Sequence, residues 1–189
     1  MISFERTVRL LVWGVALASF AFGLYHWLVL DIPFIFGAAI TYIIVLFCIP
    51  LLTSSRRWGA MLQVLLMVNM ILNGWGSFGW YRTLYFYDDM VHFISPVVMM
   101  WGFSIWYGLK HGGNAKIPWE VVALALFIGF VWEPMEYYGD MLLASQTYGQ
   151  VGQPLDTVYD LIMDTSGVAV GYVIFLFTRR PALRWILSK

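Results

Sequence analysis

Residues 87–109 read YDDMVHFISPVVMMWGFSIWYGL, a stretch that joins a membrane-spanning length to three ionisable side chains near its start. Beyond Asp88, Asp89 and His92 the stretch is almost wholly apolar, and it matches the roughly 20 residues that a helix needs to cross a bilayer core. Ionisable residues inside a membrane are rare, costly and usually functional. The sequence therefore predicts a membrane helix that carries part of a functional site at one end.

The composition of the whole chain indicates an integral membrane protein. Hydrophobic residues make up 61% of the 189 residues and charged residues only 12%, against about 25% charged residues in a soluble domain. A backbone in lipid must satisfy its own hydrogen bonds, so long apolar runs predict helices. Six runs are long enough, at about 8–30, 34–53, 59–81, 88–109, 118–143 and 156–178. The predicted fold is an all-α, six-transmembrane-helix bundle that forms a single membrane domain over residues 1–189, with its first run retained as a helix.

The basic residues predict the orientation of this bundle. With six spans, both termini and the second and fourth loops share one side of the membrane. Ten of the eleven Lys and Arg residues fall on that side, and Arg82 alone falls on the other. Cytoplasmic loops carry an excess of Lys and Arg, so we expect both termini in the cytoplasm of a bacterial cell. The same balance, with a net charge of zero, leaves no basic surface for nucleic acid.

The acidic residues gather in the predicted outer half, where they form stripes on three helices. Asp88 and His92 have i,i+4 spacing, Glu133, Glu136 and Asp140 have i,i+3 and i,i+7 spacing, and Asp156, Asp160 and Asp164 have i,i+4 and i,i+8 spacing. Each set therefore lies on one helix face. At about 1.5 Å of rise per residue, five of these side chains are expected in one layer below the surface: His92, Glu133, Glu136, Asp160 and Asp164. Asp88, Asp89, Asp140 and Asp156 would ring the mouth of this site, with Arg82 nearby.

The region from 87 to 171 resembles the YjdF-type inner-membrane proteins, which belong with the VanZ-like membrane proteins. Three motifs carry the resemblance: YDDMVHF (87–93), WEPMEYY (132–138) and YGQVGQPLDTVYDLIMDTSG (148–167). It implies that the family's polar residues are Asp88, His92, Glu133, Glu136, Asp156 and Asp160. Gln153 and Asp164 depart from the YjdF-type pattern. VanZ-like proteins are linked to glycopeptide-antibiotic resistance without an agreed reaction, so the resemblance supports the fold and the site more than a function.

We expect the layer of carboxylates and imidazole to bind a divalent metal ion. Oxygen ligands favour Mg²⁺, Mn²⁺ or Ca²⁺, and one histidine is compatible with Zn²⁺ or Fe²⁺. The predicted ligands are His92, Glu133, Glu136, Asp160 and Asp164, and Asp88 is expected to orient the imidazole. Metal-activated water would serve a hydrolase or transferase. Glu136 and Asp160 are its predicted catalytic residues, and the substrate would be an envelope lipid, a headgroup or a lipid-linked molecule outside the cell.

Three other interpretations remain open at this point. Clustered carboxyl groups disfavour one another's ionisation, and the first of these interpretations is therefore a proton- or cation-coupled transporter. The second is an accessory or binding subunit, paired with another membrane protein or with a second copy of itself. In the third, the acids are protonated and hydrogen-bonded and fix helix packing. Scarce polar residues in the cytoplasmic half argue against a transport path.

Overall fold

The computed structural model describes residues 3–30, 33–53, 55–76, 80–84, 86–111, 116–143 and 154–188. Within these ranges the chain is helical and contains no strand. The helices are α1 (Phe4–Leu30), α2 (Pro33–Leu52), α3 (Arg56–Trp75), α4 (Tyr81–Thr83), α5 (Tyr87–Lys110), α6 (Trp119–Leu143) and α7 (Pro154–Leu187). All except the short α4 supply a span that is long and apolar enough to cross a membrane. The predicted all-α fold with six transmembrane helices is confirmed.

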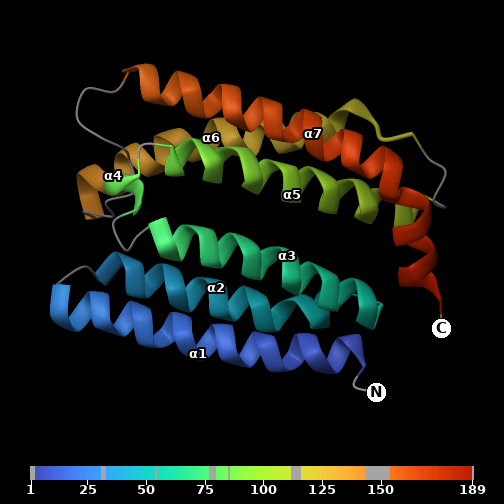
Figure 1. The fold of residues 1–189 in the computed structure, drawn as a ribbon, viewed down its shortest axis with the longest axis horizontal. Helices are drawn as coiled ribbons and strands as arrows, with labels where there is room; N and C mark the ends of the chain where they lie inside the picture. The colour runs from blue at the N-terminus through green and yellow to red at the C-terminus, as the bar shows by residue number, and fades with distance from the viewer. Residues whose placement is uncertain are drawn as a thin grey trace.

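The six long helices lie side by side in two groups (Figure 1). Helices α1, α2 and α3 pack together, α7 packs most closely on α5, and α3 joins the two groups through α5. Both chain termini lie at one end of the bundle, and α4 lies at the other (Figure 1). Leu17, Phe127 and Phe177 are among many large apolar side chains on the outer surface, and an apolar surface of this extent is expected to face lipid.

Helices α5 and α7 approach each other closely because α7 carries glycines where they cross. A Cβ atom on Gly167 would lie 2.3 Å from the carbonyl oxygen of Phe93, and one on Gly171 would lie 2.5 Å from that of Val97. Small residues at i,i+4 positions allow membrane helices to pack backbone against backbone. This contact fixes the positions of the ionisable residues on the two helices relative to each other.

A proline inside α2 explains a hydrogen bond between α2 and α3. Pro50 has no N–H to donate to the carbonyl of Leu46, four residues earlier. The buried Gln63 side chain of α3 donates to that carbonyl at 3.0 Å. An unpaired backbone carbonyl in the hydrocarbon region costs several kcal/mol, so Gln63 stabilises the kink-prone turn of α2.

Two helices end at residues other than those expected from hydropathy. The run predicted at 59–81 is α3, which ends at Trp75, and Tyr81 begins the separate α4. The Tyr81 hydroxyl donates to Asn73 Oδ1 at 3.1 Å, and that of Tyr87 donates to the Leu72 carbonyl at 2.6 Å. Burial raises the pKa of Tyr81 well above its usual value, so this hydroxyl remains a donor. The first residues of α4 and α5 therefore contact the C-terminal end of α3.

Helix α7 continues to Leu187, beyond the predicted end at 178, although Pro181 lies within it. Leu183 and Ile186 are buried against Trp58 of α3 and Ile105 of α5. Arg57 Nη1 donates to the carbonyls of Trp185 at 2.8 Å and Ser188 at 2.5 Å. Hydropathy did not indicate this segment because its support comes from α3, which is distant in sequence.

Candidate functional site

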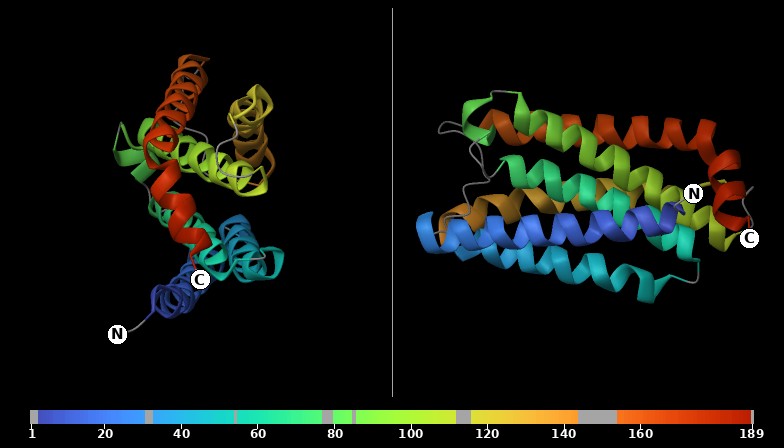
Figure 2. Two further views of the ribbon diagram at one scale, coloured as in Figure 1. Left: turned by 90° about the vertical axis from the view of Figure 1, so that its right-hand side faces the viewer. Right: turned by 60° about the horizontal axis from the view of Figure 1, so that its bottom comes forward.

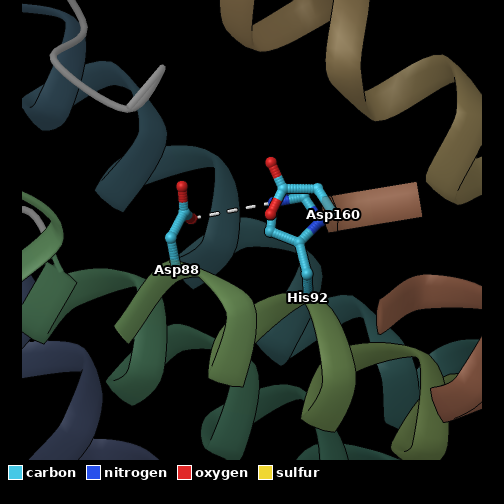
Figure 3. A group of neighbouring side chains, drawn as sticks. All are labelled: Asp88, His92 and Asp160. Carbon is cyan, nitrogen blue, oxygen red and sulfur yellow. Dashed lines mark ion pairs between the residues drawn. The ribbon is translucent and has the colours of Figure 1, made fainter. Parts of the chain in front are cut away.

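His92 lies at the centre of a group of carboxylates contributed by three helices. Its Nε2 atom lies 3.7 Å from Asp88 Oδ1 and 3.6 Å from Glu136 Oε2. Its Nδ1 atom lies 3.6 Å from Glu133 Oε1 and 3.3 Å from Asp164 Oδ1. Figure 3 shows the carboxylate of Asp160, from α7, beside the same ring. We call Asp88, His92, Glu133, Glu136, Asp160 and Asp164 the His92 cluster.

Helical spacing accounts for this convergence. Asp88 and His92 occupy successive turns of α5, Glu133 and Glu136 share one face of α6, and Asp160 and Asp164 share one face of α7. The two aspartates of the first helical turn in α5 also suit the positive end of its dipole. The structure thus brings together the five predicted layer residues.

Two overlapping sets within the cluster have the spacing of metal ligands. Asp88, His92 and Asp160 form one set, and His92, Glu133 and Glu136 form the other. In each set the ligand atoms all lie within 4.8 Å of one another. A carboxylate–imidazole set of this kind suits Mg²⁺, Mn²⁺, Zn²⁺ or Fe²⁺. Asp88, which we expected only to orient the imidazole, stands where it can act as a ligand.

The cluster is buried, and much of its hydrogen-bonding capacity is unused. His92 is 5% exposed and Asp160 only 2%. Three oxygens of the cluster have no hydrogen-bond partner: Asp88 Oδ1, Asp160 Oδ1 and Asp164 Oδ2. A buried charge or polar group without a partner is strongly unfavourable. Among the described side chains, His92 is the one basic group paired with these carboxylates. A single imidazolium cannot balance the charge of all of them, and a bound cation would balance more of it.

Two residues that sequence reasoning missed also shape the cluster. The Trp132 indole N–H donates to Glu136 Oε1 at 2.6 Å, which leaves Glu136 Oε2 directed at His92. A Cβ atom on Gly129 would lie 2.3 Å from Asp164 Oδ2, so the absence of a side chain there makes space for Asp164. Gly129 precedes Glu133 by four residues on the same face of α6, and this spacing was the available signal.

The residues predicted at the mouth of the site differ in where the structure places them. Asp89 and Asp156 are partly exposed and belong to neither ligand set. The side chains of Arg82 and Asp140 lie outside the described part of the structure. Of the predicted mouth residues whose side chains the structure describes, Asp88 alone lies within the cluster.

Two cavities between the helices reach the cluster. The larger has a volume of about 640 Å³ and lies between α2, α3, α5 and α6, where it meets His92 and Asp164. We call it the apolar groove. The smaller, of about 150 Å³, lies between α1, α2, α3 and α6 and meets Glu136. Trp132 borders both cavities, together with Tyr42 and Asn73, so the indole that donates to Glu136 lies beside each of them.

Together these features define a multi-pass membrane protein with a buried carboxylate–histidine cluster between its last three long helices. The chain belongs to a family described as predicted membrane protein (DUF2238), whose model matches residues 8–181. No curated protein and no solved structure is significantly similar to it. The family description supports the membrane location and carries no reaction.

Proposed function

We propose that this protein binds a divalent metal ion at the His92 cluster and uses it to transform a lipid headgroup or a lipid-linked substrate. The observation that carries the proposal is the set of buried carboxylates that surround one imidazole, with oxygens of Asp88, Asp160 and Asp164 that accept no hydrogen bond. A divalent cation would neutralise two of the carboxylates and occupy their free lone pairs. Among the described side chains, one imidazole is the basic partner of these carboxylates, so helix packing alone explains the cluster less well.

Each residue of the His92 cluster would have its own role in this reaction. His92, Glu133, Glu136, Asp160 and Asp164 would hold the metal, and Asp88 would hold the imidazole or complete the ligand set. The bound ion would supply a water of lowered pKa and neutralise charge on a phosphoryl or acyl oxygen. Glu136, fixed by Trp132, and Asp160, with an unpartnered oxygen, would accept and return protons. This arrangement fits a metal-dependent hydrolase or transferase.

The proposal also includes the location of the protein in the cell and its relationship to two groups of membrane proteins. The uneven distribution of Lys and Arg supports an inner-membrane protein with cytoplasmic termini and with the cluster facing outward. The location of both termini at one end of the bundle fits this orientation (Figure 1). The motifs at 87–93, 132–138 and 148–167 support kinship with the YjdF-type and VanZ-like proteins.

A transport path is less well supported by the polar residues below the cluster. Thr41 and Asn69 donate to backbone carbonyls within their own helices, and Gln63 donates to the Leu46 carbonyl. These side chains complete local backbone hydrogen bonding, a role that needs no moving proton or ion.

Metal content is the direct test. Detergent-purified protein, equilibrated with each of Mg²⁺, Mn²⁺, Ca²⁺, Zn²⁺ and Fe²⁺ and then desalted, is expected to retain close to one or two ions per chain by mass spectrometry. The Glu136→Gln, Asp160→Asn double variant is expected to retain almost none. The Asp89→Asn, Glu120→Gln variant removes the same two charges outside the ligand sets and should match the parent. A metal-free parent would refute the proposal and favour the transporter or accessory interpretation.

Replacing Gly129 by alanine tests the geometry without removing a ligand. The new Cβ atom would meet Asp164 Oδ2 at 2.3 Å and Cγ at 2.9 Å, so Asp164 must turn away from His92. We expect metal affinity to fall by roughly 10- to 100-fold, the usual effect of disturbing a ligand's support. Titration against a chelating dye measures it. Gly37→Ala, where no atom lies within 4 Å of the new Cβ, is the control, and equal affinities would contradict the described geometry.

A further inference from the structure

The apolar groove is polar at one end and apolar along the rest of its length. His92, Asp164 and Ser95 lie at the cluster end, together with Asn69 and Asn73 from α3. Ser95, three residues after His92, has a buried hydroxyl without a hydrogen-bond partner. Trp58 and Trp106 line the other end. This distribution matches an amphiphile with its headgroup near His92.

The length of the groove exceeds one leaflet of a membrane. His92 and Trp106, which line its two ends, are fourteen residues apart on α5, which corresponds to about 21 Å along the helix. Half of a bilayer's hydrocarbon core is about 15 Å. The cavity volume of about 640 Å³ also lies in the range of ligand pockets, roughly 300–1,000 Å³. The groove can therefore hold a long hydrocarbon chain lengthwise.

The groove opens sideways between the two groups of helices. Val45 of α2 and Leu124 of α6 line it, and they are 44% and 47% exposed. The end-on view in Figure 2 shows α6 beside α5, with α2 in the other group of helices. An exposed apolar wall on each side of a groove in a membrane protein gives a chain direct entry from the surrounding lipid.

We propose that the apolar groove binds the hydrocarbon chain of a phosphate-bearing membrane lipid, which enters between α2 and α6 and places its headgroup at the His92 cluster. The phosphate preference rests on the proposed function, because a bound divalent ion is what would attract an anion to these carboxylates. The binding of the chain rests on the groove alone. This names the substrate class as a long-chain lipid phosphate.

Two photoreactive lipids test the inference. They also distinguish the two kinds of lipid that could supply a long-chain phosphate. One is a phosphatidic acid and the other a polyprenyl phosphate, each with a diazirine near the end of the chain. In detergent-purified full-length protein, the preferred probe is expected to label the segments around Trp58, Trp106 and Val121. The same probe with its diazirine beside the phosphate should label the segments around Ser95 and Ile128 instead. Labelling confined to outward-facing positions such as Leu17, Phe127 and Phe177, or absent with both probes, would overturn the inference.

Matched tryptophan variants show whether the groove itself is labelled. Leu124→Trp on α6 and Val45→Trp on α2 narrow the groove from opposite walls. Both variants are expected to lose labelling at the end of the groove that Trp58 and Trp106 line. Leu126→Trp and Ile44→Trp add the same side chain to neighbouring positions that do not line the groove and should keep it. Equal labelling in all four would reject the groove as the binding site. Two walls are used so that one poorly folded variant, detected by gel filtration, leaves the test intact.

Metal measurements on the same samples separate this inference from the proposed function. Groove labelling in a protein that never binds metal would support the chain site and reject the metal proposal. Stoichiometric metal without groove labelling would support the metal proposal and reject the chain site. Labelling by the phosphate probes that falls on treatment with a chelator would support both, because the headgroup then depends on the ion.

Discussion

Replacing Gly167 by leucine is expected to force α5 and α7 apart and to prevent stable folding. The first atom of the new side chain would lie 2.3 Å from the Phe93 carbonyl oxygen, which belongs to the backbone and cannot rotate away. Overpacking of a core usually costs about 1–3 kcal/mol. We expect a larger loss here, because moving a whole helix is the one way to relieve this contact.

The melting temperature in detergent measures the loss of stability, and size-exclusion chromatography of the purified protein detects aggregation. Gly14→Leu is the matched control, because no atom lies within 4 Å of a Cβ atom at Gly14 on the exposed face of α1. We expect Gly14→Leu to behave as the parent and Gly167→Leu to aggregate or to melt far below it. A Gly167→Leu protein as stable as the control would contradict the close α5–α7 packing.

The polar stripes were predictable because helical periodicity determines which residues of one segment share a face. The i,i+4 spacing of Asp88 with His92 and of Asp160 with Asp164 needs only the geometry of a single helix. Apolar run length likewise predicted six spans, since the hydrocarbon core sets the length of a helix. Both signals are local, and both are carried by side-chain type.

What the sequence left open depends on how helices distant in sequence face one another. Periodicity does not say that His92 lies at the centre of the cluster or that Gly129 makes room for Asp164. The groove has walls from α2, α3, α5 and α6, so it exists only once the two groups of helices are packed. The extension of α7 is similar, since its support comes from Arg57 and Trp58 of α3.

Substituting His92 by glutamine is expected to abolish metal binding with the largest effect of any single change in the cluster. His92 belongs to both ligand sets, and each of its ring nitrogens faces two carboxylates at 3.3 to 3.7 Å. Glutamine keeps a polar side chain of similar bulk but offers no nitrogen lone pair. The loss in affinity should therefore exceed the roughly 10- to 100-fold that follows removal of a supporting residue.

The decisive measurement is the melting temperature with and without metal. A ligand that binds only the folded state adds about 2.7 kcal/mol at one hundred times its dissociation constant. We expect metal to stabilise the parent and the control variant His111→Gln, which changes an exposed histidine at the end of α5, and to leave His92→Gln unchanged. If His92 instead acts as a protonated partner of the carboxylates in a metal-free cluster, its removal should cost about 3–5 kcal/mol even in chelator. Metal would then stabilise none of the three proteins, and the cluster would be a buried ion-pair network.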